Sequence, residues 1–324
     1  MVNAVWEDLI GQESLVSRCK AMVASGRVPH ALIISAPAGA GKSTLAEILT
    51  RALLCTHGNA PCGICSNCQK VLHGNHPDVV RIGISGKNTV VSKSVEQIIS
   101  ELAVKPYEGG RRIVILEDAH AMSLAAQNKL LKSLEEPPEA SILLLLCDTL
   151  SSLLPTIISR CAMLRMCRVP TRDLAQLLVN RWGMMTMRAQ VIANLSDGWV
   201  GRAMQMARDD SIWQIREEAF AVLRYLSSPG GIFLAYQHVT PLRARWPQLI
   251  SFWQTILRDC LLEDASLFIH KDHAKDLAAL QSRYHDGALR RKCASLIRAE
   301  YDLAQNANPS LVMDSLLLDL MAAE

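Results

Sequence analysis

Short runs of apolar residues alternate with longer amphipathic stretches over the first half of the chain. Apolar residues recur at helical spacing from Gln12 to Ser25, which predicts a helix. The run His30–Ser35 is almost wholly apolar and indicates a buried strand. The same patterns predict a helix over 41–54, a strand over Val79–Ile84, a helix over 93–104, a strand over Arg112–Glu117, a helix over 123–134 and a strand over Ser141–Cys147. Strands that alternate with helices favour a parallel α/β sheet, and this alternation ends near Met166.

The second half of the chain has a helical pattern throughout. Residues 170–208 indicate a small helical unit, and from about residue 211 onward leucines and alanines recur at spacings of three and four. We therefore expect three domains: an α/β domain over 1–168, a small helical domain over 169–209 and an all-helical domain over 210–324.

Composition narrows the class of protein without identifying it. A chain of 324 residues suits two or three domains, and a net charge of +3 is too small to argue nucleic-acid binding by itself. The first residues lack a basic region followed by an apolar stretch, and runs such as Ile142–Cys147 are too short to cross a bilayer. We expect a soluble, cytoplasmic protein, in which clustered cysteines more often bind metal than form disulfides.

A glycine-rich segment follows the first predicted strand. Residues 36–44 read Ala-Pro-Ala-Gly-Ala-Gly-Lys-Ser-Thr, which fits a phosphate-binding P-loop except that Ala36 replaces the first glycine. Backbone N–H groups of such a loop cradle phosphates, its lysine reaches the outer phosphates and its serine holds Mg²⁺. If the first position requires a positive φ, alanine is strained there. The alternative is a helix start that is merely rich in glycine. The predicted nucleotide-binding residues are Gly39, Gly41, Lys42, Ser43 and Thr44.

An acidic pair ends the strand predicted at Arg112–Glu117. P-loop enzymes usually place Asp-Glu here, whereas this chain has Glu117 followed by Asp118. Each exchange alters the reach of the side chain by roughly 1.5 Å, and a misplacement of about 1 Å can cost on the order of 100-fold in rate. The pair therefore favours nucleotide binding over rapid hydrolysis, with solvated strand-end carboxylates as the alternative.

Four cysteines lie close together directly after the phosphate-loop helix: Cys55, Cys62, Cys65 and Cys68. Four thiolates complete a tetrahedral zinc shell, and two Cys-x-x-Cys pairs provide its tight turns. Such a site has no open position, so the zinc is expected to be structural. Three nearby histidines are candidates to replace one ligand: His57, His73 and His76. The alternative is a surface loop with free cysteines, which would expose reactive thiols.

Five segments of the chain, together with the position of the cysteine cluster, match signatures of one family. They are Gly11–Glu13, His30–Ala31, Pro106–Arg112, Ala125–Pro138 and Ser159–Cys161. With them the chain resembles the bacterial DNA polymerase III clamp-loader ATPases. The resemblance is strong over the first 210 residues, and beyond them it rests on length and a late Asn-Pro-Ser-Leu segment. It implies an AAA+ P-loop domain with a zinc module inserted at 55–68, then a helical lid domain and a helical collar domain.

The resemblance also assigns roles to three charged residues. Arg160 would be an arginine finger that acts in trans, reaching a neighbouring subunit's nucleotide and stabilising charge on the transferred phosphoryl group. Arg202, in a second-sensor segment, would contact the nucleotide from the lid. Asp148 occupies the first-sensor position, where its charge would face phosphate unfavourably. An ordinary surface role is the alternative for both arginines.

Two branches of the family fit the chain. The tau/gamma motor subunits hydrolyse ATP and commonly carry further domains, whereas delta-prime ends after the collar and often has a degraded nucleotide site. Because this chain ends at Glu324, retains Arg160 and departs from the motif at its own nucleotide site, we favour delta-prime. That assignment implies a stator that joins tau/gamma and delta subunits and helps load the sliding clamp onto primed DNA. The intact Lys42 and Ser43 are compatible with binding of ATP and Mg²⁺, but the chain's own ATPase is expected to be weak or absent.

Two alternatives belong to other classes of protein. A zinc-containing nucleic-acid-binding module would favour interleaved aromatic and basic residues, but basic residues near the cluster are few, among them Lys70, Lys87 and Arg81. A P-loop enzyme of another family would need a substrate site in the helical half, where no nucleophile and base pair up in the sequence.

Overall fold

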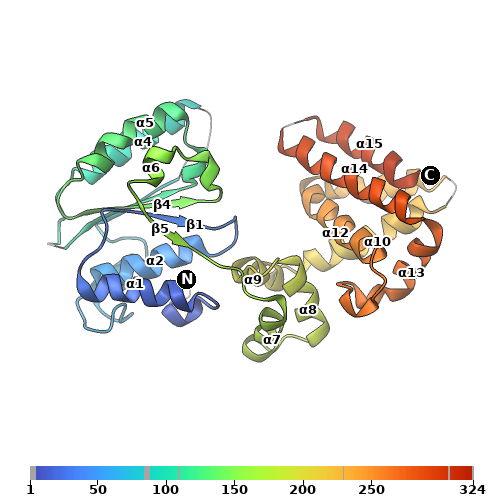
Figure 1. Ribbon diagram of the computed structural model, residues 1–324, viewed down its shortest axis with the longest axis horizontal. Coiled ribbons are helices and arrows are strands. Elements are labelled where there is room, and N and C mark those ends of the chain that lie inside the picture. Colours follow the sequence, from blue (N-terminus) through green and yellow to red (C-terminus); the bar gives the residue numbers. More distant parts are fainter. Residues whose placement is uncertain (1–4, 84–87, 109, 229, 306, 323–324) are drawn as a thin grey trace. The chain divides into compact units, whose positions relative to one another are not determined.

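The computed structural model describes residues 5–83, 88–108, 110–228, 230–305 and 307–322, shown in Figure 1. The chain divides into two units, one containing the residues up to 169 together with 199–202 and the other containing 170–198 and 203–324. The division into three domains made from the sequence stays a prediction. Within the described ranges, none of the helices combines the length and apolar character that crossing a bilayer requires.

Five parallel strands form the sheet of the first unit, in the order β2-β3-β4-β1-β5. Their bounds are β1 Ala31–Ser35, β2 Val79–Gly83, β3 Arg112–Glu117, β4 Ser141–Cys147 and β5 Ala162–Arg165. The strand β1 lies between β4 and β5, where Ile34 pairs with Leu146 on one side and Leu164 on the other. The predicted parallel α/β sheet is therefore confirmed.

Helices cover both faces of this sheet (Figure 1). One face packs against α1 Glu13–Ser25 and α2 Lys42–Leu54, and the other against α4 Asn88–Leu102, α5 Leu124–Glu135 and α6 Pro155–Ile158. Along β1, Leu32 and Ile34 enter the first of these cores and Ile33 enters the second. A strand that is buried on both faces is apolar along its whole length, which is why the sequence pattern identified it.

Three elements of the first unit lie outside the sequence predictions: the helix α3, the short helix α6 and the strand β5. The four-residue edge strand β5 lacks the long apolar run that marks the central strands β1, β3 and β4. The helix α3 Ser66–Leu72, which packs against α2, forms within the cysteine segment. In addition, α4 begins at Asn88 rather than Lys93, and Ile84 lies outside the described residues. Short 3₁₀ turns occur at Trp6–Asp8, Ala119–Ala121 and Leu150–Ser152.

The second unit is all-helical, as the sequence predicts. Its helices are α7 Thr171–Trp182, α8 Thr186–Leu195, α9 Val200–Arg208 (whose first turn belongs to the first unit), α10 Ser211–Leu226, α11 Ile232–Val239, α12 Trp246–Cys260, α13 Ala274–Arg283, α14 Asp286–Ala304 and α15 Pro309–Met321, with 3₁₀ turns at Thr240–Arg245, Ala265–Leu267 and Lys271–His273. A continuous apolar core centred on Trp253 and Phe220 joins α10 to α15. Within it the carboxylate of buried Asp259 accepts the backbone N–H groups of Ile269 and His270, so the loop after α12 is held by a satisfied buried charge.

The sheet gives a direct stability prediction. Leu144 on β4 is fully buried between β1 and β3, whereas Leu124 at the start of α5 is 65% exposed. We expect Leu144→Ala to lower the free energy of unfolding by about 2–5 kcal/mol through lost transfer energy and cavity formation. The control Leu124→Ala should change it by less than about 0.5 kcal/mol. Urea unfolding followed by far-UV circular dichroism measures both, and equal effects would contradict the assignment of β4 to the core.

Candidate functional site

Three loops meet at the carboxyl edge of the sheet. The phosphate loop follows β1, the acidic pair follows β3, and Asp148 follows β4. Because these strands are neighbours and parallel, their following loops share one edge, where parallel α/β sheets bind ligands. The topology thus brings together the nucleotide-binding residues that the sequence predicted.

The phosphate loop turns tightly between Ser35 and the start of α2. Gly39 and Gly41 carry its positive φ angles, +74° and +102°, which glycine adopts without steric cost. Ala36 is not among the described residues with positive φ, and its N–H donates to the carbonyl of Cys147 at 3.2 Å. The expected strain at Ala36 is therefore absent, because the left-handed positions fall later in the loop.

Lys42 at the start of α2 is already fully engaged. Its Nζ donates to the carbonyls of Ala36 (2.8 Å) and Pro37 (3.1 Å) and forms an ion pair with Asp148. An ammonium group has three donors, so these three partners satisfy it. Lys42 is 9% exposed. A phosphate arriving at this lysine would have to displace a carboxylate that already neutralises it.

The first turn of α9 lies directly on the phosphate loop. Trp199 packs against Ala36 and Ala40, and Arg202 Nε donates to the carbonyl of Ala38 at 2.8 Å. A Cβ atom on Gly201 would lie 2.3 Å from the carbonyl oxygen of Gly39. Only glycine permits this close approach, so the first turn of α9, which carries Arg202, packs directly against the phosphate loop. Arg202 therefore lies at the loop with its guanidinium on a loop carbonyl, and its contact with a nucleotide stays a prediction.

The two residues of the acidic pair point to different surroundings. Glu117 lies near Arg81, with 3.4 Å between Oε1 and Nη1. Asp118 has φ +53°, and its carboxylate lies within 4.8 Å of ligand atoms of His120 and Asp148. Asp118, rather than Glu117, therefore places its carboxylate beside Asp148, the ion-pair partner of Lys42. This arrangement differs from the usual order, in which the first acidic residue of the pair faces the metal.

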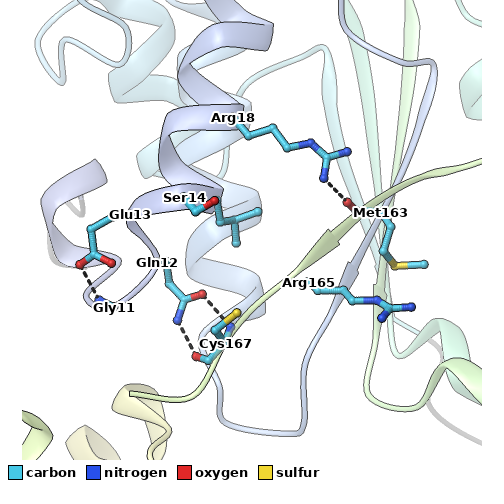
Figure 2. A pocket seen from close by; sticks show the side chains of 9 residues that line it. Gly11, Gln12, Glu13, Ser14, Arg18, Met163, Arg165 and Cys167 are labelled. Carbon is cyan, nitrogen blue, oxygen red and sulfur yellow. Dashed lines mark hydrogen bonds between the residues drawn. The ribbon is translucent and has the colours of Figure 1, made fainter. Parts of the chain in front are cut away.

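A groove of about 400 Å³ lies between the start of α1 and β5 (Figure 2). The Gln12 side chain makes hydrogen bonds of 2.6 and 2.8 Å with the backbone of Cys167, and Arg18 Nη1 donates to the carbonyl of Met163 at 2.9 Å. The sequence singled out Gly11–Glu13 only as a signature. In the structure Gln12 fastens the chain before α1 to the chain that leaves β5.

The four cysteines of the cluster converge. The sulfurs of Cys62 and Cys68 lie 4.0 Å apart, as do those of Cys65 and Cys55. A tetrahedral site with Zn–S bonds of about 2.3 Å places its sulfurs roughly 3.8 Å apart, so these two separations fit a metal of this kind. The ligand atoms within 4.8 Å of one another are those of Cys55, His57, Cys62 and Cys65. Backbone N–H groups of Cys62, Cys65 and Cys68 point at the sulfurs of Cys55, Cys62 and Cys65, respectively.

The acidity of these thiols follows from their surroundings. Burial opposes ionisation of Cys65, but backbone N–H groups of Thr56 and Cys68 outweigh it and lower its pKa to about 5. Backbone N–H groups of Ile64 and Cys65 also lower the pKa of Cys62. Burial raises the pKa values of Cys68 and Cys55. The site therefore favours thiolates on the Cys62–Cys65 turn, as a cation ligand set requires.

The three histidines separate into two groups. His57 lies within 4.8 Å of the ligand atoms of Cys55, Cys62 and Cys65. His73 instead lies 2.7 Å from the carbonyl of Gln69, and His76 accepts the N–H of Asp78 at 3.1 Å. His57 is thus the one histidine of the three that the structure brings to the cluster.

The cysteine segment also closes the end of α2. The side-chain amide of Asn67 donates to the carbonyl of Leu54 at 2.9 Å, and the thiol of Cys68 lies 3.8 Å from the carbonyl of Arg51. These carbonyls belong to the last turn of the helix, where no intrahelical donor is available. The module therefore caps the helix that begins at Lys42.

Arg160 lies at the opposite edge of the sheet from the phosphate loop. The parallel register pairs Leu32 with Ala162 and Ser35 with Arg165, so Arg160 precedes β5 while the phosphate loop follows Ser35. Four residues of β5 separate these levels by roughly 13 Å at about 3.3 Å per residue. The exposed guanidinium contacts Glu135 (2.7 Å) and the carbonyl of Thr156 (3.0 Å), far from its own chain's Lys42.

Sequence reasoning missed two buried polar anchors, one inside a signature segment and one that binds the backbone of another. Gln127 donates to the carbonyls of Met122 and Ser152 and accepts the N–H of Leu154, which ties α5 to the segment before α6. Asp78 accepts N–H groups from the loop at 106–112, of which Gly109 lies outside the described residues. An amide on the apolar face of an amphipathic helix and an acid beside proline were the available signals.

Comparisons with known proteins give matches over the first half of the chain and beyond. Residues 11–170 match the family described as DNA polymerase III, delta subunit. The chain is similar to DNA polymerase III subunit delta' of Yersinia pestis, 39% identical over 163 residues, and of Escherichia coli K12, 35% identical over 231 residues. The match covers 49% of this chain and 45% of the Yersinia protein, and 68% of both chains for Escherichia coli.

The fold also has a counterpart among solved structures. A DNA polymerase III gamma subunit-related protein from Thermotoga maritima aligns with a TM-score of 0.50 at 17% identity, covering 94% of this chain and 98% of that chain. At this level of identity the likeness concerns the fold alone.

Proposed function

The chain belongs to the DNA polymerase III clamp-loader subunits of the delta-prime type, and we propose that it acts as a stator within such a complex. In that role the chain would place Arg160 at the ATP bound by a neighbouring subunit and would itself hydrolyse little ATP. The observation that carries this proposal is the ion pair between Lys42 and Asp148, which occupies the group that a motor subunit needs for phosphate.

The cis site offers little electrostatic attraction for a nucleotide. Asp148 cancels the charge of Lys42 in a largely buried setting, and the carboxylate would repel phosphate oxygens. Arg202 is engaged with the carbonyl of Ala38. Glu117 lies near Arg81, so it is not positioned to activate water at the loop. Binding of ATP with Mg²⁺ by Gly39, Gly41, Lys42, Ser43 and Thr44 would require these contacts to rearrange.

The trans contribution rests on the position of Arg160. A guanidinium at the amino edge of the sheet cannot serve the phosphate loop at the carboxyl edge, but it is exposed to a neighbour. Arginine fingers supplied in this way stabilise the charge of the transferred phosphoryl group. The neighbour would be a tau/gamma-type subunit, and the complex would include a delta subunit, the sliding clamp and primed DNA.

The cysteine cluster would hold a structural Zn²⁺ ion. Cys55, Cys62, Cys65 and Cys68 supply four soft ligands at suitable separations, and a full shell leaves no position for catalysis. When bound, zinc supplies cross-linking of the loop, and the residues themselves cap α2 through Asn67 and Cys68.

Replacing Asp148 tests the closed cis site. We expect Asp148→Ser to increase affinity for a fluorescent ATP analogue about tenfold, equivalent to about 1.4 kcal/mol, because Lys42 loses its internal counter-ion. Fluorescence anisotropy with Mg²⁺ measures the affinity. Asp173→Ser on α7 removes the same charge elsewhere and should leave affinity unchanged. Equal affinities of Asp148→Ser and the wild type would contradict the proposal, as would rapid ATP turnover by the isolated wild-type chain.

Replacing Arg160 tests the finger. In a complex reconstituted with its tau/gamma and delta partners, Arg160→Ala should lower DNA-stimulated kcat for ATP by at least the share of one site. Loss of an arginine finger costs on the order of 10³–10⁵ at the site concerned. Arg172→Ala, an exposed arginine on α7, serves as the control. A complex that retained full ATPase with Arg160→Ala would exclude the finger role.

Metal content tests the cysteine site. The purified chain should contain close to one zinc per molecule by plasma mass spectrometry, and Cys62→Ser should lower both zinc content and the melting temperature. Metal binding of this kind is coupled to folding. Cys167→Ser, at an exposed cysteine outside the cluster, should change neither quantity. Full zinc content in Cys62→Ser would remove that residue from the ligand set.

A further inference from the structure

The guanidinium of Arg160 is held at two points although its side chain is exposed. Nη2 lies 2.7 Å from Oε1 of Glu135, and Nη1 donates to the carbonyl of Thr156 at 3.0 Å. A freely rotating arginine loses roughly 2 kcal/mol of rotamer entropy when it is immobilised. Because these two contacts already restrict the side chain before the subunits assemble, less rotamer entropy is lost when Arg160 contacts a nucleotide.

These contacts leave the group able to bind an anion. Arginine has five N–H donors in a planar fork, of which the hydrogen bond to Thr156 uses one, while Glu135 forms an ion pair at Nη2. The guanidinium therefore retains donors on both terminal nitrogens for a further acceptor. The guanidinium is oriented by Glu135 and Thr156 without being covered by them.

The position of Glu135 has no explanation within its own helix. It is the last residue of α5, where a carboxylate is disfavoured by the partial negative charge of the helix end. The preceding turn is fixed, because Leu130 and Leu134 are buried and the ring of His30 lies 3.1 Å from the carbonyl of Leu134. Arg160 supplies the cation that offsets the charge of Glu135, and α5 supplies a rigid base for the pair.

We propose that Glu135 is a positioning residue, which orients the guanidinium of Arg160 toward the nucleotide bound by the neighbouring subunit. The inference rests on the proposed role of Arg160 as a finger. If the carboxylate instead held Arg160 away from the nucleotide, removal of Glu135 would raise the rate of ATP hydrolysis.

The test compares Glu135→Ala, Glu135→Gln and Glu136→Gln with Arg160→Ala in the reconstituted complex. The quantity measured is the contribution of Arg160 to kcat for ATP, defined as the difference between the wild-type kcat and the kcat of Arg160→Ala. Glu135→Ala should lower that contribution about tenfold, since a small misplacement of a catalytic group has a large effect, and KM for ATP should stay within about twofold because ground-state binding is unaltered. Glu135→Gln should retain most of it, because the amide oxygen can contact Nη2 of Arg160 from the same position.

Glu136→Gln is the matched control, because in the described ranges Glu136 makes no ion pair. It should behave as the wild type, and co-elution of each variant with its partners verifies assembly. If Arg160→Ala lowers kcat while Glu135→Ala equals or exceeds the wild type, Glu135 does not position the finger and the stator role stands. If Arg160→Ala itself has no effect, the finger role fails and this inference fails with it.

Discussion

All five strands of the sheet run in one direction, so their carboxyl ends share one edge and their amino ends share the other. Loops that follow the strands collect the phosphate loop, Asp118 and Asp148 at the first edge. The turn that precedes β5 places Arg160 at the second. A chain built in this way cannot bring Arg160 to its own phosphate loop, because strand direction places the two at opposite edges of the sheet.

At the carboxyl edge the decisive departure from the P-loop pattern is electrostatic rather than conformational. Ala36 replaces glycine without strain, because its N–H continues the ladder to Cys147 and the positive φ angles belong to Gly39 and Gly41. Asp148, in contrast, supplies a negative charge to the one buried cation of the loop. A single carboxylate that follows a neighbouring strand therefore neutralises the lysine of this loop.

The elements with the clearest sequence signal were those with the simplest environment. β1, β3 and β4 are buried on both faces, so their apolar runs gave their bounds to within one residue. β5 escaped prediction because it has only four residues and ends in an arginine. The cysteine spacing predicted a cluster that the fold does bring together. The expected strain at Ala36 was wrong, since the sequence cannot tell which loop residue adopts the left-handed conformation.

The pairs that matter most in space could not be read from the sequence. In the sequence, most of the α/β domain lies between Lys42 and Asp148, which form an ion pair in the structure. Glu135 and Arg160 come into contact because α5 and α6 pack on the same face of the sheet. Gln127 offered a weak signal as an amide on an apolar helix face, but its three backbone partners become visible only when the loop before α6 is in place.

The capping of α2 by the cysteine segment connects two regions that lie about 20 Å apart along the helix, at 1.5 Å for each of its 13 residues. The carbonyls of Arg51 and Leu54 receive donors from the segment that the metal would cross-link, while the other end of the same helix presents Lys42. Loss of the ion would leave the sheet intact but allow the last turn of α2 to fray. Oxidation of the cysteines would then first loosen the C-terminal end of α2, before any change in the strands of the sheet.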